Sequence, residues 1–306
     1  MRYESYQELI GNTPLVRISR FDIPEGTKLY AKLELANPGG SVKDRIGRAM
    51  IDDAERRGAL KKGGTVVEGT AGNTGIGIAF AALGRGYRVI FVVPDKFSGE
   101  KVALLRALGA EIVRTPRADG MLLAEKTADE IADATSGAVV LGQFHNPANP
   151  RANYETTGPE IWRDMDGQID AFVAGAGSGG TFSGVVRYLK EKNPAIRAIL
   201  ADPVGSTMGG GEHGDYEIEG IGNDFIPDTM DMSLVDEVVK VTDTEAYAHV
   251  RQLARREGIF AGSSSGGALA AALKLVEGGA RGNIVAVFPD RGDRYFSKGL
   301  YETPTV

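Results

Sequence analysis

Cysteine is absent from the 306-residue chain, and this absence excludes several kinds of chemistry. Without thiols the chain can form no disulfide, no thiolate metal site and no cysteine nucleophile. Histidine is nearly as scarce, and the spacing of the three residues, His145, His213 and His249, fits no zinc motif. We therefore expect no metal site, and any catalytic group must come from another residue type.

Basic charge and long apolar runs are lacking as well. Lys and Arg number 35 against 41 Asp and Glu, a net charge of −6, whereas nucleic-acid binding calls for a basic surface. The apolar run at 89–93 has the length of a strand rather than of a membrane span. The first residues include acidic side chains and no apolar signal-peptide core. We expect a cytoplasmic protein that binds neither nucleic acid nor membrane.

Glycine, in contrast, is abundant. It accounts for 42 of the 306 residues, and this is roughly twice its average usage. No repeat of three residues accompanies it, so a collagen-like structure is excluded. The excess is expected in turns and in loops where the backbone approaches a ligand closely, such as phosphate-binding loops.

Short apolar segments alternate with longer helical patterns from residue 65 onward. Strands are predicted at 65–68, 87–94, 110–115, 138–144, 171–174, 196–202 and 284–288. Helices are predicted at 43–51, 75–83, 100–108, 121–134, 182–191, 242–258 and 267–276. This alternation is typical of an α/β fold whose parallel sheets are covered by helices on both faces. The acidic, glycine-rich stretch 203–234 interrupts it, and long loops of this kind are usually functional or mobile.

Three glycine-rich loops follow predicted strands, where α/β proteins bind their ligands. The loop 175–180 matches G-x-G-x-x-G, and Asp202 ends the next strand at the distance of a ribose-binding acid, so an NAD-dependent dehydrogenase is one alternative. The same loop could instead bind a single phosphate through its amides and the helix N-terminus that follows. A tight turn without a ligand is the third possibility.

The other two loops are less specific when taken alone. The loop 68–75 offers Thr and Asn side chains and backbone amides that suit a carboxylate, and the loop 262–267 contains three serines. In both loops the polar side chains could instead cap the helix that follows.

Lys43 lies in a loop, 37–45, that contains Pro38 and two glycines and leads into a helix. Most lysines are solvated surface charges. A helix N-terminus beneath the amine, however, would disfavour its charged form, so that it could lose its proton near neutral pH and form a Schiff base.

Eight segments of the chain resemble, in order, those of the cysteine synthase and cystathionine β-synthase family of fold-type II pyridoxal-phosphate enzymes. They are 10–15, 40–45, 70–75, 143–150, 156–162, 177–181, 219–222 and 262–266. The resemblance runs almost from end to end. It implies two three-layer αβα domains with mainly parallel sheets, similar to the β subunit of tryptophan synthase, with the cofactor in the cleft between them. We expect a small, mobile domain at 40–145 and a larger one formed by 1–39 and 146–306.

The resemblance also implies roles for individual residues. Lys43 would form the internal aldimine with pyridoxal phosphate and move the α-proton of the substrate, Asn73 would bind the ring hydroxyl, and Ser264 would face the pyridine nitrogen. The residues implied to hold the cofactor phosphate are Gly177, Ser178, Gly179, Gly180 and Thr181. Those implied to bind the substrate are Thr70, Ala71, Gly72, Thr74, Gln143 and Gly222.

The implied reaction is β-replacement on an activated serine, with O-acetylserine as the expected substrate and an α-aminoacrylate intermediate. A neutral serine opposite the ring nitrogen makes the ring a weaker electron sink, which suits loss of a β-substituent better than transamination. Sulfide is the expected nucleophile, which makes the enzyme a cysteine synthase. The alternative with the same chemistry is a cystathionine β-synthase that uses homocysteine. The family also implies a homodimer and a possible serine acetyltransferase partner.

Two positions depart from the family pattern. Ala71 stands where the family commonly has serine, which removes one hydroxyl near the substrate and leaves the choice of nucleophile open, and Ser178 replaces the usual threonine. The segment 219–227 is more similar to cystathionine β-synthases, whereas 233–238 and 290–295 are more similar to a second class of bacterial cysteine synthases. A non-catalytic binding protein that keeps the fold is the remaining alternative, and an intact Lys43 disfavours it.

Overall fold

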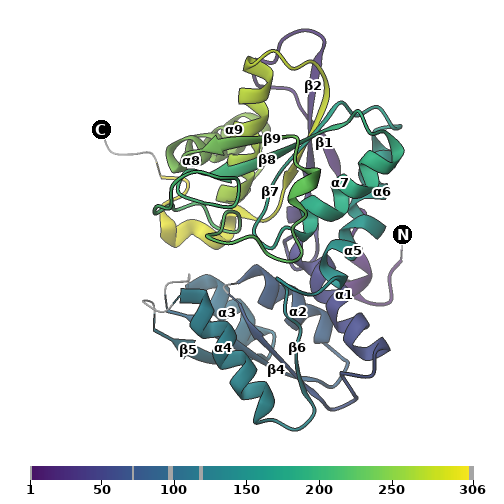
Figure 1. The fold of residues 1–306 in the computed structure, drawn as a ribbon, viewed down its shortest axis with the longest axis vertical. Helices are drawn as coiled ribbons and strands as arrows, with labels where there is room; N and C mark the ends of the chain where they lie inside the picture. Colours follow the sequence, from purple (N-terminus) through teal and green to yellow (C-terminus); the bar gives the residue numbers. More distant parts are fainter. Residues whose placement is uncertain (1, 71, 96–98, 117–119, 303–306) are drawn as a thin grey trace. The chain divides into compact units, whose positions relative to one another are not determined.

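The computed structural model describes residues 2–70, 72–95, 99–116 and 120–302. The chain divides into two compact units. Unit 1 comprises Met1–Ile10 and Asn37–Asn149, and unit 2 comprises Gly11–Ala36 and Pro150–Val306. Figure 1 follows the chain through both. Each unit contains a mainly parallel sheet with helices, so the predicted α/β fold class is confirmed.

The first ten residues group with unit 1, although we expected all of 1–39 in the larger domain. The Gln7 side-chain amide donates to the carbonyl oxygens of Phe80 and Leu83, at 2.6 Å and 3.2 Å. The ring of Tyr6 also meets the ring of Phe80 edge to face, with centroids 5.8 Å apart. These contacts hold the N-terminal residues on α2.

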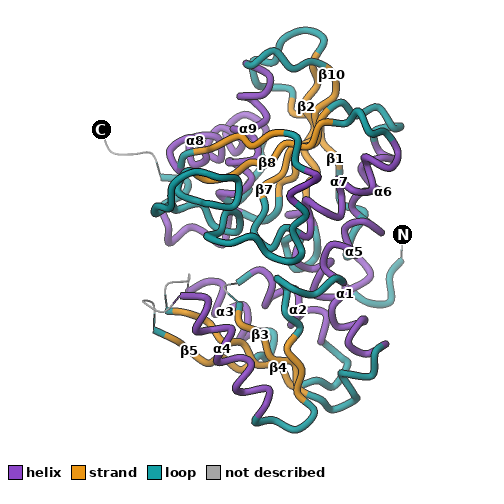
Figure 2. The backbone as a smooth tube through the Cα atoms, in the orientation of Figure 1, coloured by secondary structure: helices purple, strands orange, loops and turns teal. Residues whose placement is uncertain are grey.

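Unit 1 is built around a four-stranded parallel sheet in the order β5-β4-β3-β6. Figure 2 draws the strands in orange. Its strands are β3 (Thr65–Gly69), β4 (Arg88–Pro94), β5 (Glu111–Thr115) and β6 (Ala138–Val140). Its helices are η1 (Tyr6–Leu9), α1 (Lys43–Arg56), α2 (Asn73–Ala82), α3 (Gly99–Ala107) and α4 (Gly120–Asp133). The chain passes from unit 1 into unit 2 within α5 (Ala148–Glu155).

Helices α1 and α2 approach each other unusually closely. A Cβ atom added to Gly47 of α1 would lie 2.6 Å from the backbone nitrogen of Ile78, and one added to Gly77 of α2 would overlap the carbonyl oxygen of Lys43. Both glycines are buried. Because neither position has room for a side chain, the two glycines bring the backbone of Lys43 against α2.

Unit 2 is built around a six-stranded sheet in the order β1-β2-β10-β7-β8-β9, in which only the β1–β2 pair is antiparallel. Its strands are β1 (Leu15–Ile18), β2 (Thr27–Leu33), β7 (Ala171–Gly175), β8 (Arg197–Pro203), β9 (Glu237–Val241) and β10 (Gly282–Phe288). Its helices are η2 (Glu34–Ala36), α6 (Thr157–Asp164), α7 (Gly180–Lys192), η4 (Met232–Leu234), α8 (Asp243–Gln252), the π-helical η5 (Leu253–Glu257), α9 (Ser263–Glu277) and η6 (Gly292–Lys298).

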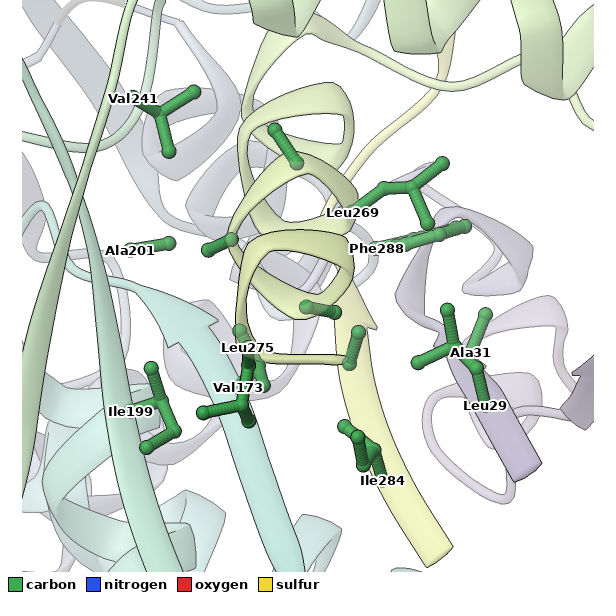
Figure 3. Packing of buried hydrophobic residues seen from close by; sticks show 14 of the residues in the cluster. Leu29, Ala31, Val173, Ile199, Ala201, Val241, Leu269, Leu275, Ile284 and Phe288 are labelled. Carbon is green, nitrogen blue, oxygen red and sulfur yellow. The ribbon is translucent and has the colours of Figure 1, made fainter. Parts of the chain in front are cut away.

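Side chains of the central strands alternate between two cores, as the two-residue period of a strand requires. Val173, Ile199 and Ile284 pack on one face against α9, and Figure 3 shows them around Leu269 and Leu275 of that helix. Their neighbours along the strands pack on the other face against α6 and α7; they are Phe172, Ala174, Ala198, Leu200, Val285 and Val287. Strands buried on both faces read as continuous apolar runs, and the sequence therefore predicts them well.

The strand expected at 138–144 ends at Val140. The N–H groups of Leu141, Gly142 and Gln143 donate to the carboxylate of Glu68 instead of to a neighbouring strand. Gly142 also has a φ of +65°, which lies outside the strand region. A carboxylate buried in β3 therefore ends β6.

Among the described helices, none has both the length and the apolar character needed to cross a membrane. The long stretch without regular structure between β8 and η4 is also where the sequence predicts an interruption.

Replacing Gly77 with alanine tests the close approach of α1 and α2. The new Cβ would overlap the carbonyl oxygen of Lys43, so we expect the free energy of unfolding to fall by about 1–3 kcal/mol in urea titrations. Gly267→Ala is the matched control, because this helical glycine in α9 has its nearest neighbour, Cδ1 of Ile221, at 3.4 Å. It should be neutral or stabilising by up to about 1 kcal/mol. Equal losses in both variants would contradict the packing described here.

Candidate active site

Lys43 is the first residue of α1 and is partly buried. Its backbone N–H donates to the hydroxyl of Ser41 at 3.2 Å. The N–H of Gly39 donates to the carboxylate of Asp44 at 2.6 Å, and a side chain at Gly39 would collide with that carboxylate. The loop before α1 is thus folded back on the first turn of the helix, which fixes the backbone from which the lysine side chain extends.

The loop after β3 leads into α2, whose N-cap is Gly72. The hydroxyl of Thr70 accepts hydrogen bonds from the N–H groups of Gly75 and Gly72, at 3.2 Å and 3.4 Å. Gly72 has a φ of +152°, and a Cβ atom there would lie 2.5 Å from Cδ of Lys101. Asn73 is the first residue of α2, and Ala71 lies outside the described residues.

Thr74 and Gln143, which the resemblance assigns to the substrate site, lie together in unit 1. The Thr74 hydroxyl donates to the side-chain oxygen of Gln143 at 2.7 Å, and both residues are buried. The side-chain amide of Asn149 donates to the backbone oxygen of Gln143 at 2.8 Å. The hydroxyl of Thr74 is therefore not a simple helix cap.

Glu68 is a residue of this site that the sequence interpretation missed. Its side chain is 2% exposed and accepts the N–H groups of Leu141, Gly142 and Gln143 at 2.9–3.1 Å. Burial raises the pKa of Glu68 to about 7, and the three backbone donors act in the opposite direction. An acidic residue within the otherwise apolar Thr-Val-Val-Glu-Gly strand was the signal that could have identified it.

In unit 2, β7 leads through the loop 176–179 into α7, whose N-cap is Gly179 in the left-handed conformation, with a φ of +80°. A Cβ atom on Gly177 would lie 2.5 Å from the carbonyl oxygen of Gly220, and one on Gly179 would overlap Cβ of Met230. Within the described part of the chain, the N–H groups of Gly177 and Gly179 meet no acceptor. Unpaired donors at a helix N-terminus fit a phosphate group.

Gly222 lies beside this loop, since its N–H donates to the carbonyl oxygen of Ala176 at 2.8 Å. Its φ is +81°, and a Cβ atom would lie 2.9 Å from the hydroxyl oxygen of Tyr216, so a larger residue would be strained there.

The serine loop begins α9, with Gly262 as its N-cap. The hydroxyl of Ser263 accepts the N–H of Glu219 at 3.0 Å, so this serine joins the loop to the 218–223 segment. Ser264 is 2% exposed in the first turn. The hydroxyl of Ser265 is buried without a hydrogen-bond partner among the described residues. The alternative that all three serines only cap the helix is not supported.

Asp202, the candidate ribose-binding acid of a dehydrogenase, is buried and paired with a lysine. One of its carboxylate oxygens pairs with the amine of Lys240 at 2.5 Å and accepts the N–H of Gly209 at 3.1 Å. The residue is only 1% exposed. A ribose could reach this side chain only if the residues that cover it moved, so its burial disfavours the NAD alternative.

A family model described as "Pyridoxal-phosphate dependent enzyme" matches residues 6–290. The chain belongs to this family. Its cofactor is pyridoxal phosphate, and the match assigns the G-x-G-x-x-G loop to an enzyme of this family rather than to an NAD-dependent one.

Relatives of known name agree with this assignment. The chain is 52% identical over 296 residues to the "O-acetylserine dependent cystathionine beta-synthase" of Bacillus subtilis, with 96% of each chain covered. It is 46% identical over 298 residues to a "Cysteine synthase" of Helicobacter pylori, covering 96% of this chain and 98% of the other. The predicted resemblance to cysteine synthases and cystathionine β-synthases is confirmed.

Comparison with a solved structure shows that the similarity includes the three-dimensional fold. It is the O-acetylserine-dependent cystathionine β-synthase of Helicobacter pylori, which superposes with a TM-score of 0.95 at 44% identity and covers 98% of this chain and 99% of the other. The predicted fold of this pyridoxal-phosphate family is thus confirmed along nearly the whole chain.

The raised pKa of Glu68 gives this enzyme a testable dependence of stability on pH. The folded chain holds the Glu68 proton more tightly than the unfolded chain, so the stabilisation is complete below the ordinary pKa of 4.5 and is lost as pH rises through about 7. Relative to Glu68→Gln, the free energy of unfolding of the unmodified chain should fall by up to about 3 kcal/mol over this range. Urea titrations at several pH values measure the difference, and a constant difference would contradict the assignment.

Proposed function

We propose that this enzyme replaces the acetate group on Cβ of O-acetylserine with a sulfur nucleophile. The observation that carries the proposal is the 52% identity, over 96% of both chains, to a relative named for this substrate. The intact Lys43 at the start of α1 supports a catalytic rather than a purely binding role.

Residues from both units are proposed to hold the cofactor. The phosphate is assigned to Gly177, Ser178, Gly179, Gly180 and Thr181, because the loop provides N–H groups at the start of α7. The pyridine nitrogen is assigned to Ser264, the ring hydroxyl to Asn73, and the aldehyde carbon to the side-chain amine of Lys43. When bound, the cofactor supplies a ring that withdraws electrons from Cα of the substrate.

The substrate carboxylate is assigned to the loop after β3 and to the residues beside it. The proposed residues are Thr70, Ala71, Gly72, Thr74, Gln143 and Gly222. The hydrogen bond between Thr74 and Gln143 supports this assignment within unit 1, because it shows that two of the proposed residues are in contact. Glu68 holds the backbone at Gln143 and is proposed to position that residue.

The proposed reaction exchanges one group at Cβ. The amine of Lys43 removes the α-proton of O-acetylserine, and acetate then departs from Cβ with the electrons of its C–O bond. The sulfur nucleophile forms a bond to Cβ, and the amine of Lys43 returns a proton to Cα. The sum is O-acetylserine plus thiol giving a thioether or cysteine plus acetate.

Sulfide and homocysteine are the two candidate nucleophiles. The sequence interpretation favours sulfide, and the cysteine synthase of Helicobacter pylori supports that choice. Homocysteine is favoured by the higher identity to the Bacillus subtilis relative and by the solved structure of the Helicobacter pylori cystathionine β-synthase. Both nucleophiles are compatible with the same acetate-releasing first half of the reaction.

We infer a cytoplasmic homodimer that could bind a serine acetyltransferase. The cofactor is expected between a small mobile domain and a larger one, and closure of the small domain would exclude water from the reaction.

Lys43→Ala tests the catalytic assignment. The purified enzyme should be yellow, and treatment with borohydride followed by peptide mass mapping should place the reduced cofactor on Lys43. The alanine variant should lose this adduct and at least about 10³-fold in turnover, since no other group at that position can move the α-proton. Lys62→Ala, a surface lysine after α1, serves as the control and should retain the adduct. An adduct on another lysine in the unmodified enzyme would contradict the assignment.

Product analysis tests the substrates. We expect acetate release from O-acetylserine with either sulfide or homocysteine, and little product from serine, whose hydroxide is a poorer leaving group than acetate. The ratio of kcat/KM for homocysteine to that for sulfide decides the nucleophile. Higher kcat/KM with serine than with O-acetylserine, for both nucleophiles, would contradict the proposed leaving group.

A further inference from the structure

The irregular segment 222–229 bonds to three consecutive carbonyl groups of the phosphate loop. The carbonyl oxygen of Ala176 accepts the N–H of Gly222 at 2.8 Å. The carbonyl oxygen of Gly177 accepts the side-chain amide of Asn223 at 2.6 Å, and that of Ser178 accepts the hydroxyl of Thr229. All of these contacts lie within unit 2.

These bonds determine where the loop amides point. In a trans peptide the N–H lies on the side opposite the C=O, and this chain has no cis peptide bond among its described residues. The carbonyl groups of 176, 177 and 178 face the 222–229 segment, so the N–H groups of Gly177, Ser178 and Gly179 point away from it. Two of the three bonds come from side chains, and these can be changed without altering the loop itself.

Asn223 is itself fixed by its backbone. Its N–H donates to the buried hydroxyl of Ser206 at 3.0 Å, and its carbonyl oxygen accepts the N–H groups of Thr207 and Met208 at 3.0 Å and 3.2 Å. These three hydrogen bonds fix the backbone from which the Asn223 side chain extends. Because a carbonyl oxygen only accepts, the nitrogen of the Asn223 amide must face Gly177.

We propose that Asn223 and Thr229 are positioning residues that orient the backbone amides of the loop toward the cofactor phosphate. This inference deepens the proposed function and depends on its assignment of the phosphate to residues 177–181. The two residues bind the carbonyl side of the loop and do not contact the cofactor themselves. They affect cofactor binding only through the orientation of the loop N–H groups. Their effect should therefore be selective for ligands that carry a phosphate.

The test compares two forms of the same ligand. Full-length protein is freed of cofactor with hydroxylamine, and equilibrium dialysis gives dissociation constants for pyridoxal phosphate and for pyridoxal, which lacks the phosphate. Both ligands retain the aldehyde that reacts with Lys43. Asn223→Ala and Thr229→Val each remove one hydrogen bond, so we expect each to weaken pyridoxal phosphate about five- to tenfold. Pyridoxal should change less than about twofold.

Two control variants separate positioning from loss of structure. Thr229→Ser retains the hydroxyl and should restore most of the affinity that Thr229→Val loses. Asp224→Asn changes an exposed neighbour whose carboxylate pairs with His213 at 2.9 Å, and it should leave both constants unchanged. Equal weakening of both ligands by Asn223→Ala and Thr229→Val, or no weakening, would overturn the inference. If the unmodified protein itself did not prefer pyridoxal phosphate over pyridoxal, the phosphate assignment of the proposed function would fail instead.

Discussion

Three of the helices that carry proposed site residues begin at glycine. Gly72, Gly179 and Gly262 are the N-caps of α2, α7 and α9, and glycine has no side chain with which to cap the first N–H groups of a helix. Helix α8 shows the contrast, because Thr242 and Glu245 form a complete capping box at its N-terminus. Glycine at an N-cap costs only a few tenths of a kcal/mol relative to a capping side chain. At α7 the N–H groups of Gly177 and Gly179 meet no acceptor among the described residues, which supports the proposed phosphate site.

Two loops of the enzyme are fixed through opposite sides of their peptide groups, one through its carbonyl oxygens and the other through its N–H groups. In unit 2, donors from the 222–229 segment bind the carbonyl groups of residues 176–178, and the N–H groups of that loop point away from the segment. In unit 1, the carboxylate of Glu68 accepts hydrogen bonds from the backbone N–H groups of residues 141–143. An anionic ligand can be bound by the first arrangement but not by the second, because Glu68 already occupies its donors. Since the N–H of Gln143 already donates to Glu68, the side chain of Gln143 is the group proposed to serve the substrate site.

Most of the strands, the helices after them and the glycine-rich loops could be predicted from the sequence. Strands buried on both faces are long apolar runs, and glycine marks the loops where side chains do not fit. The strands β1, β2 and β9 were not predicted, because their partly exposed residues do not form such runs. Asp202 illustrates a second limit: its spacing from the G-x-G-x-x-G loop suggested a ribose-binding acid, but Lys240, 38 residues further on, neutralises it. Neither this pair nor the bond from Asn223 to Gly177, across 46 residues, follows from local sequence.

The surroundings of Ser264 bear on the type of reaction. Asp290 lies beside this loop, since a side chain at Gly262 would overlap its carboxylate. The hydroxyl of Tyr295 donates to this carboxylate, and burial together with the charge of Asp290 raises the pKa of Tyr295 well above its usual value. Tyr295 thus stays protonated and keeps donating to Asp290, while the first turn of α9 presents only serine hydroxyls. A neutral hydroxyl does not stabilise a protonated pyridine nitrogen as a carboxylate would. With Ser264 at that nitrogen, as proposed, the ring would withdraw electrons less strongly. Loss of acetate from Cβ, which β-replacement requires, would then be favoured over reactions that need a long-lived deprotonated substrate.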